Sequence, residues 1–130
     1  FEKLTDVGFE SPSTSYRRYN GQDYQYVWGA ADGPATASSY TSSLVKIDVT
    51  SGASLSFGDD ENIYGEPVFV ARPGGNAEDD GVLVSVGSHR REDRSSLVIV
   101  DASTMTLVAS AEVPRAIPLG FHGSFVRAGA

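Results

Sequence analysis

The sequence predicts an all-β protein built from antiparallel strands, and three observations support this fold class. Short apolar or alternating runs, rich in Val, Ile, Leu, Tyr and Phe, recur along the chain. Turn sequences such as ADGP, TSG, RPGG, EDDG and DAST separate these runs, and no stretch keeps a helical period. The segments between the runs are too short for crossover helices, which excludes a parallel α/β fold.

The predicted strands form a single β domain over residues 1–130, a length that suits one domain or a piece of a larger one. Each run has the length of a strand and is bounded by turn residues. The runs are 24–29, 43–48, 54–57, 67–71, 81–87, 96–101, 107–113 and 122–126.

An internal repeat suggests how these strands are organised. SLVKIDVTSGASLSF at 43–57 aligns with SLVIVDASTMTLVAS at 96–110, and GEPVFV at 65–70 aligns with FHGSFV at 121–126. In each copy, a strand leads into a hairpin whose turn begins with aspartate, followed by a strand of small residues and a final apolar strand. This order is the anatomy of a four-stranded propeller blade.

We therefore predict two antiparallel blades, with blade-like repeats at 24–70 and 81–126. A matched pair of hairpins in a β-sandwich would give the same spacing and is the alternative architecture.

Composition limits the functions open to the chain. It carries 17 acidic and 10 basic residues, a net charge of -7, so nucleic acid is a poor partner. The absence of cysteine excludes disulfides and thiol catalysis. No run approaches a membrane-spanning length, and FEKLTDVGFE does not have the pattern of a signal peptide. We expect a cytoplasmic protein, with peripheral contact to a membrane as an additional expectation.

The repeat alignment places Glu66 opposite His122 in adjacent blades. If both lie on innermost strands, the carboxylate and the imidazole point at the central channel, where they are suited to bind a metal or to orient a metal ligand. Gly123 would leave room beside such a centre. The alternative is a structural role, with His122 as a core histidine and Glu66 as a carboxylate at a strand edge.

The residues at 64–126, with those at 11–30 before them, resemble the C-terminal part of the carotenoid cleavage oxygenases. This family includes the retinoid isomerase of the retinal pigment epithelium. The ordered motifs GEPVFVARP, EDDGVLVS, LVIVDA and PLGFHG carry the resemblance, which covers most of the chain.

The resemblance implies a seven-bladed propeller with a non-haem Fe(II) on its axis, bound by four histidines, three of them braced by glutamates. His122 matches the last iron ligand, and Glu66 matches a bracing glutamate. The implied reaction is cleavage by O2 of a polyene double bond in a carotenoid or apocarotenoid, giving two carbonyl products. A non-catalytic propeller module for binding or scaffolding is the alternative function.

The chain departs from the family pattern because His122 alone lies in a ligand motif. The other ligands and blades are expected upstream of Phe1, and the missing initiating methionine favours a piece of a longer protein. We expect the chain by itself to bind no iron, to be inactive and to self-associate through apolar flanks that the remaining blades would cover.

Several other features are interpreted as structural. His89 lies in the charged segment SHRREDRSS and is expected to be solvated. DDEN at 59–62 and EDD at 78–80 lack the alternating ligand spacing of a calcium loop. Aromatic residues at alternating positions are expected to pack in the core. They are Trp28 and the tyrosines at 16, 19, 24 and 26.

Overall fold

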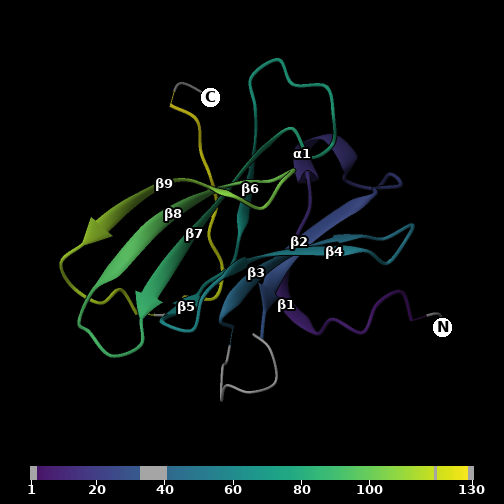
Figure 1. The fold of residues 1–130 in the computed structure, drawn as a ribbon. Coiled ribbons are helices and arrows are strands. Elements are labelled where there is room, and N and C mark those ends of the chain that lie inside the picture. Colours follow the sequence, from purple (N-terminus) through teal and green to yellow (C-terminus); the bar gives the residue numbers. More distant parts are fainter. Residues whose placement is uncertain (1–2, 33–40, 119, 129–130) are drawn as a thin grey trace.

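A computed structural model describes residues 3–32, 41–118 and 120–128 of the chain. These residues form strands, with a single short helix near the start (Figure 1). The elements are β1 (Phe9–Ser13), α1 (Tyr16–Tyr19), β2 (Tyr26–Ala31), β3 (Ser43–Asp48), β4 (Ser54–Gly58), β5 (Asn62–Tyr64), β6 (Val68–Ala71), β7 (Gly81–His89), β8 (Ser95–Asp101) and β9 (Leu107–Val113).

The strands form two antiparallel sheets, which confirms the all-β prediction. The first sheet has the order β1-β2-β3-β4. The second has the order β5-β7-β8-β9, and β6 also pairs with β7. Omitting the three-residue β5, each sheet is a meander of four strands that follow one another along the chain. The two hairpins that revealed the repeat occupy equivalent places, β3-β4 in one sheet and β8-β9 in the other.

The sheets divide the chain at a different place from the predicted repeats 24–70 and 81–126. Because β6 pairs with β7, the GEPVFV segment opens the second sheet instead of closing the first. The first sheet spans Phe9–Gly58 and the second Asn62–Val113. The apolar strand after each hairpin is therefore the first strand of the next repeat.

The predicted strand at 122–126 is not a strand in the structure. In each sheet, the first strand is paired with the strand that follows it in sequence, as β1 with β2 and β6 with β7. Among the described residues, no strand follows residue 126 to play that part. The segment therefore has no ladder partner and keeps an irregular backbone.

Three elements were missed by the sequence analysis, namely β1, α1 and β5. The sequence of β1, FESPS, contains a proline and two serines that do not read as a strand. A phenylalanine ring explains how it is held: Phe9 lies over Gly29 of β2, where an added Cβ would come within 2.2 Å of the ring. The strand thus depends on a tertiary contact rather than on its own propensity.

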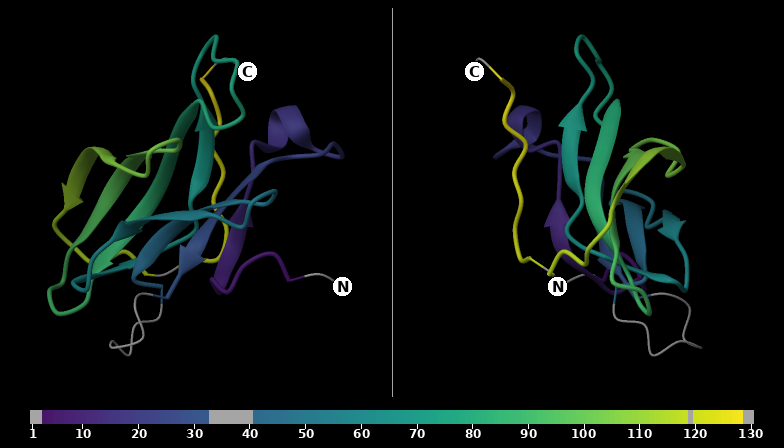
Figure 2. Two further views of the ribbon diagram at one scale, coloured as in Figure 1. Left: turned by 45° about the vertical axis from the view of Figure 1, so that its right-hand side comes forward. Right: turned by 90° about the vertical axis from the view of Figure 1, so that its left-hand side faces the viewer.

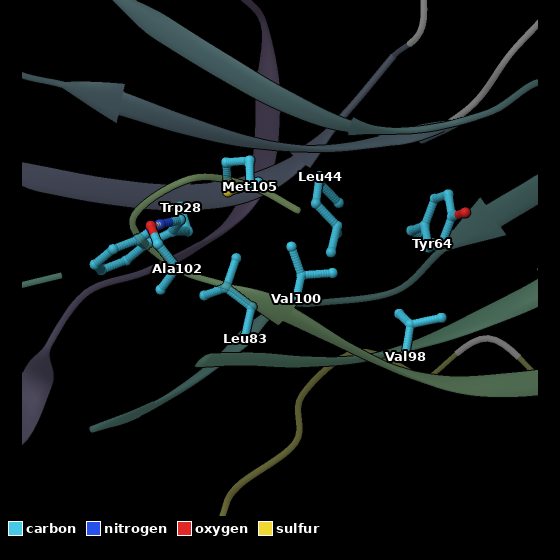
Figure 3. Packing of buried hydrophobic residues seen from close by; sticks show 9 residues of the cluster. Trp28, Leu44, Tyr64, Leu83, Val98, Val100, Ala102 and Met105 are labelled. Atoms are coloured by element: carbon cyan, nitrogen blue, oxygen red, sulfur yellow. Dashed lines mark hydrogen bonds between the residues drawn. The ribbon is translucent and has the colours of Figure 1, made fainter. Parts of the chain in front are cut away.

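The main core lies between the two sheets. Figure 3 shows Leu44 of the first sheet and Leu83 and Val100 of the second pointing toward each other, and all three side chains are fully buried. The cluster comprises Trp28, Ala30, Leu44, Tyr64, Leu83, Val98, Val100, Ala102 and Met105. Each sheet therefore buries one face against the other.

Trp28 is the centre of this core. Its indole Nε1 donates to the carbonyl of Ala102, 3.1 Å away, and its ring stacks on Phe69 with centroids 4.7 Å apart. The expected core role of the aromatic residues is confirmed for Trp28 and for the half-buried Tyr26. It is wrong for Tyr16 and Tyr24, which are exposed.

A loop of the second sheet also contacts the first sheet through polar groups. The Glu78 carboxylate accepts the backbone N–H groups of Gln25 and Tyr26 at 2.8–2.9 Å. Asp79 lies 2.6 Å from the buried Nζ of Lys46, which also donates to the carbonyl of Ser103. The same ammonium lies 3.9 Å from the centroid of the Tyr26 ring.

The Lys46–Asp79 pair allows a test of this contact. Replacing Asp79 with Ala leaves a buried ammonium without its carboxylate and should lower the free energy of unfolding by about 3 kcal/mol. The matched control is Asp80→Ala, which removes the exposed pair with Arg72 and should cost less than about 1 kcal/mol. Urea unfolding of the two variants measures both. Equal losses of unfolding free energy in the two variants would show that the buried pair stabilises the fold no more than the exposed pair does.

Each hairpin turn is organised by its first aspartate. Asp101 accepts the N–H groups of Ser103 and Thr104 and the hydroxyl of Ser103 at 2.7–3.0 Å. These hydrogen bonds, led by the Ser103 hydroxyl, lower the pKa of Asp101 to about 2. Asp48 accepts N–H groups in the same way at the other turn.

The low pKa of Asp101 predicts a pH dependence. Because the folded pKa lies below the unfolded value of about 4, the stabilisation is complete above pH 4 and is lost as the pH falls toward 2. Asp101→Asn keeps an acceptor oxygen and removes the titration. Unfolding in urea between pH 5 and 2 should show the wild type losing about 1 kcal/mol more than this variant. Parallel curves for the two proteins would contradict the assignment.

Candidate metal-ligand site

The structure brings together the two residues that the sequence analysis selected. Glu66 lies just before β6, and His122 lies in the segment 120–128, which runs beside β6 (Figure 2). His122 Nδ1 is 3.3 Å from Glu66 Oε1. The second carboxylate oxygen, Oε2, accepts the backbone N–H of Gly123 at 2.7 Å. One carboxylate therefore contacts both the imidazole and the backbone next to it.

The segment and β6 run in the same direction. Gly123 faces Glu66 and Val68, whereas Arg127, further along, donates to the carbonyl of Ala71 at 3.2 Å. No ladder joins the two, so side chains and single hydrogen bonds hold them together within the described residues. Glu66 supplies the shortest of these contacts.

The two partners differ in exposure. The Glu66 side chain is 18% exposed, whereas that of His122 is 79% exposed. The carboxylate thus lies largely within the fold, whereas the imidazole lies at the surface beside it. Because Nδ1 is turned toward Glu66, Nε2 faces away from the carboxylate. Nε2 is therefore the ring nitrogen that could bind a metal ion.

Gly123 contributes to the contact with Glu66 through its backbone. An added Cβ would lie 3.4 Å from Val68 Cγ2, an ordinary contact, so the described residues do not require a glycine for space. Its backbone N–H matters instead, because it is the group that Glu66 Oε2 accepts.

Two hollows border Glu66. A groove of about 590 Å³ follows β6 between the end of β1 and residues 123–127. A second hollow of about 290 Å³ lies between the outer face of the second sheet and residues 117–125, and His122 lines it. Glu66 and Gly123 border both.

The remaining candidates lie outside the site. His89 is the last residue of β7 instead of a solvated loop residue, and its Nδ1 accepts the N–H of Glu92 at 3.0 Å. Asp59 of the DDEN segment accepts from Asn62 and from the hydroxyl of Tyr64. Both acidic segments thus bind protein donors.

Metal ligands are few in the described part of the chain. Over residues 3–32, 41–118 and 120–128, no group of three or more His, Cys, Asp or Glu side chains is arranged to hold a metal ion. His122 can provide one imidazole, and Glu66 can orient it. This set fits one position of a coordination sphere whose other ligands come from elsewhere.

Comparison with known proteins identifies the family. The model of the retinal pigment epithelial membrane protein family matches residues 2–127. The chain belongs to this family. The resemblance found in the sequence is therefore confirmed.

Several relatives in the family are named as carotenoid-cleaving enzymes. The mitochondrial carotenoid-cleaving dioxygenase of Homo sapiens is 35% identical over 120 residues, which cover 92% of this chain and 20% of the relative. A carotenoid cleavage oxygenase of Mycobacterium tuberculosis is 40% identical over 83 residues, 63% of this chain and 17% of the relative. The chain thus spans about one fifth of the length of these proteins.

Solved structures of family members share the fold. A variant of the Synechocystis apocarotenoid oxygenase superposes with a TM-score of 0.89 and 32% identity, covering 97% of this chain and 27% of that one. A cobalt-substituted form of the same oxygenase gives the same TM-score at 31% identity and the same coverage. This likeness confirms the two sheets as antiparallel propeller blades. Among the described residues, no helix is long and apolar enough to cross a membrane.

The contact between Glu66 and the backbone can be tested in the chain itself. Glu66→Ala removes the acceptor of the Gly123 N–H, so hydrogen exchange at that amide should become roughly tenfold faster or more, as expected for a hydrogen bond to a charged group. NMR exchange measurements report it directly. Amides in the β7-β8 ladder serve as internal controls and should not change. An unaltered rate at Gly123 would contradict the contact.

Proposed function

We propose that this chain is the part of a carotenoid or apocarotenoid cleavage dioxygenase that supplies one iron ligand. The ligand is His122, which would bind Fe(II) through Nε2, and Glu66 orients it. The observation that carries the proposal is the contact between His122 Nδ1 and Glu66 Oε1, 3.3 Å apart, in a chain of this family. The names of the relatives support the substrate class.

The carboxylate explains how a single imidazole becomes a directed ligand. With Nδ1–H donating to Glu66, the ring is held as the tautomer that has its lone pair on Nε2. The negative charge next to Nδ1 also makes Nε2 a better electron donor. Glu66 therefore fixes the ring's tautomer, direction and basicity without touching the metal.

The residues present fit an iron centre that is completed by other parts of the parent protein. Neutral imidazole is a suitable ligand for Fe(II), and a carboxylate behind it is a usual partner. When bound, Fe(II) supplies the activation of O2 needed to divide a carbon–carbon double bond into two carbonyl groups. We propose that the remaining propeller blades supply the other ligands, and that the parent is cytoplasmic with peripheral contact to a membrane.

The decisive experiment uses the full-length parent. His122→Ala should abolish iron retention and carotenoid cleavage. Glu66→Gln should keep much of the iron but slow turnover by roughly 10- to 100-fold, since it perturbs only the orientation and basicity of a ligand. His89→Ala is the matched control, because His89 is the last residue of β7, outside the site, and should leave both properties unchanged. Metal analysis and product assay measure each variant.

The alternative function, a non-catalytic propeller module for binding or scaffolding, predicts a different result. In that case, His122→Ala would leave any metal content unchanged, and the parent would lack the three further histidines in its upstream blades. Wild-type iron content and cleavage in the His122→Ala parent would overturn the proposal and return His122 to a structural role.

A further inference from the structure

The strand pairing of the second sheet changes register beside Glu66. The last residue of β5, Tyr64, lies opposite Gly87 of β7. The first residue of β6, Val68, lies opposite Val84 of the same strand. Between these two pairs, the side of β5 and β6 has three residues, whereas β7 has two. The extra residue makes β5 and β6 one strand interrupted by a β-bulge, and Glu66 is the middle residue of that bulge.

The residue types in the bulge suit this backbone. Pro67 has no N–H, so it loses no ladder hydrogen bond in a bulge, and its side chain is fully buried. A residue that precedes proline is confined to extended conformations, which limits the backbone of Glu66. Gly65 is held to the neighbouring strand, since its N–H donates to the carbonyl of Val86 at 2.9 Å. The backbone on both sides of Glu66 is therefore constrained.

A buried hydroxyl of β7 completes the bulge. Ser85 is 3% exposed, and its hydroxyl donates to the carbonyl of Gly65 at 2.8 Å. That carbonyl belongs to the peptide group that joins Gly65 to Glu66, and a peptide group is planar. The hydrogen bond thus restrains the plane that contains the Glu66 Cα, from which the carboxylate extends.

We propose that Ser85 is a positioning residue for the Glu66 carboxylate, acting through the carbonyl of Gly65. The carboxylate contacts two groups at once, since Oε1 lies 3.3 Å from His122 Nδ1 and Oε2 accepts the Gly123 N–H at 2.7 Å. Hydrogen bonds weaken steeply away from linearity, so a rotation of the peptide plane would weaken both contacts. β7 is paired along both edges and provides a firm base for Ser85. The relevance to catalysis rests on the proposed function, whereas the contacts belong to the chain itself.

A purely structural role for Ser85 makes a different prediction. A buried carbonyl that loses its donor lowers the stability of the whole fold and speeds amide exchange in the ladders, which open by global unfolding. Gly123 lies in a segment without a ladder, where local opening sets the exchange rate. A structural role would therefore change the ladders and leave Gly123 unchanged, whereas a positioning role changes Gly123.

Ser85→Ala in the 130-residue chain tests the positioning role without iron. Exchange at the Gly123 amide should become about two- to tenfold faster, the range for one hydrogen bond between neutral groups, and should remain slower than in Glu66→Ala. The nitrogen chemical shifts of the His122 imidazole report its tautomer at about pH 8.5, where an imidazole is neutral. They should move from the Nδ1–H tautomer toward the mixture of a free ring.

Ser43→Ala is the matched control. The Ser43 hydroxyl also donates to a carbonyl of a neighbouring strand, that of Ala31 at 3.3 Å, but in the first sheet. This variant should leave Gly123 exchange and the His122 tautomer at their wild-type values. Ser85→Thr keeps the hydroxyl and should restore both properties.

Three results would overturn the proposal. Wild-type exchange at Gly123 in Ser85→Ala would leave Ser85 a structural role only. An equal change in Ser43→Ala would show that the effect is not specific to the bulge. A Ser85→Thr chain with unchanged ladders, but with Gly123 exchange as fast as in Ser85→Ala, would show that the hydroxyl is not the group responsible.

The full-length parent carries the test to turnover. Ser85→Ala should keep the iron and the KM and lower kcat about two- to tenfold, less than Glu66→Gln does. The double variant should be no slower than Glu66→Gln alone, because residues that act through one another are not additive. An additive loss would overturn the positioning role. If His122→Ala keeps iron and activity, the proposed function fails, while the exchange rates in the chain still decide the role of Ser85.

Discussion

The arrangement of the two sheets depends on one buried ammonium group. Lys46 lies on the face of β3 that meets the second sheet, and its charge is met there by Asp79. An unpaired charge in that position would be far more costly than any single apolar contact is favourable. The loop after β6 must therefore lie across the first sheet, and Glu78 extends the same contact by accepting two backbone N–H groups at the start of β2.

The consequences reach the candidate site through β6. This strand is held at its far end by the loop that carries Asp79, in its middle by the stacking of Phe69 on Trp28, and along its length by pairing with β7. Glu66 lies two residues before this strand, and its side chain is largely buried, at 18% exposed. His122 lies on a segment without a ladder, so its place depends on Glu66. The core thus positions Glu66, and Glu66 in turn positions His122.

The sequence predicted the fold class and seven of the strands and selected Glu66 and His122 as candidate site residues, because these rest on local patterns, on a repeat and on a family resemblance. It left open which histidine Glu66 contacts. It did not predict where one sheet ends and the next begins. Which strands pair is decided by tertiary contacts, and a repeat alignment does not determine it. It missed β1, whose proline and serines are overridden by the contact of Phe9 with Gly29. It also gave no sign that Lys46 is buried, since burial of a charged side chain requires a partner from a distant loop.

The corrected sheet boundary changes the meaning of the FHGSFV segment. GEPVFV leads into the first strand of the second sheet, so its counterpart at 121–126 corresponds to the start of a third repeat rather than the end of the second. It runs beside β6 in the same direction, as the first strands of neighbouring repeats would around a common axis. Glu66 and His122 then belong to successive repeats, and their contact joins one repeat to the next. An imidazole held in this way is oriented by the repeat before it, and in a ring of similar sheets such contacts can bring single side chains from several repeats to one point.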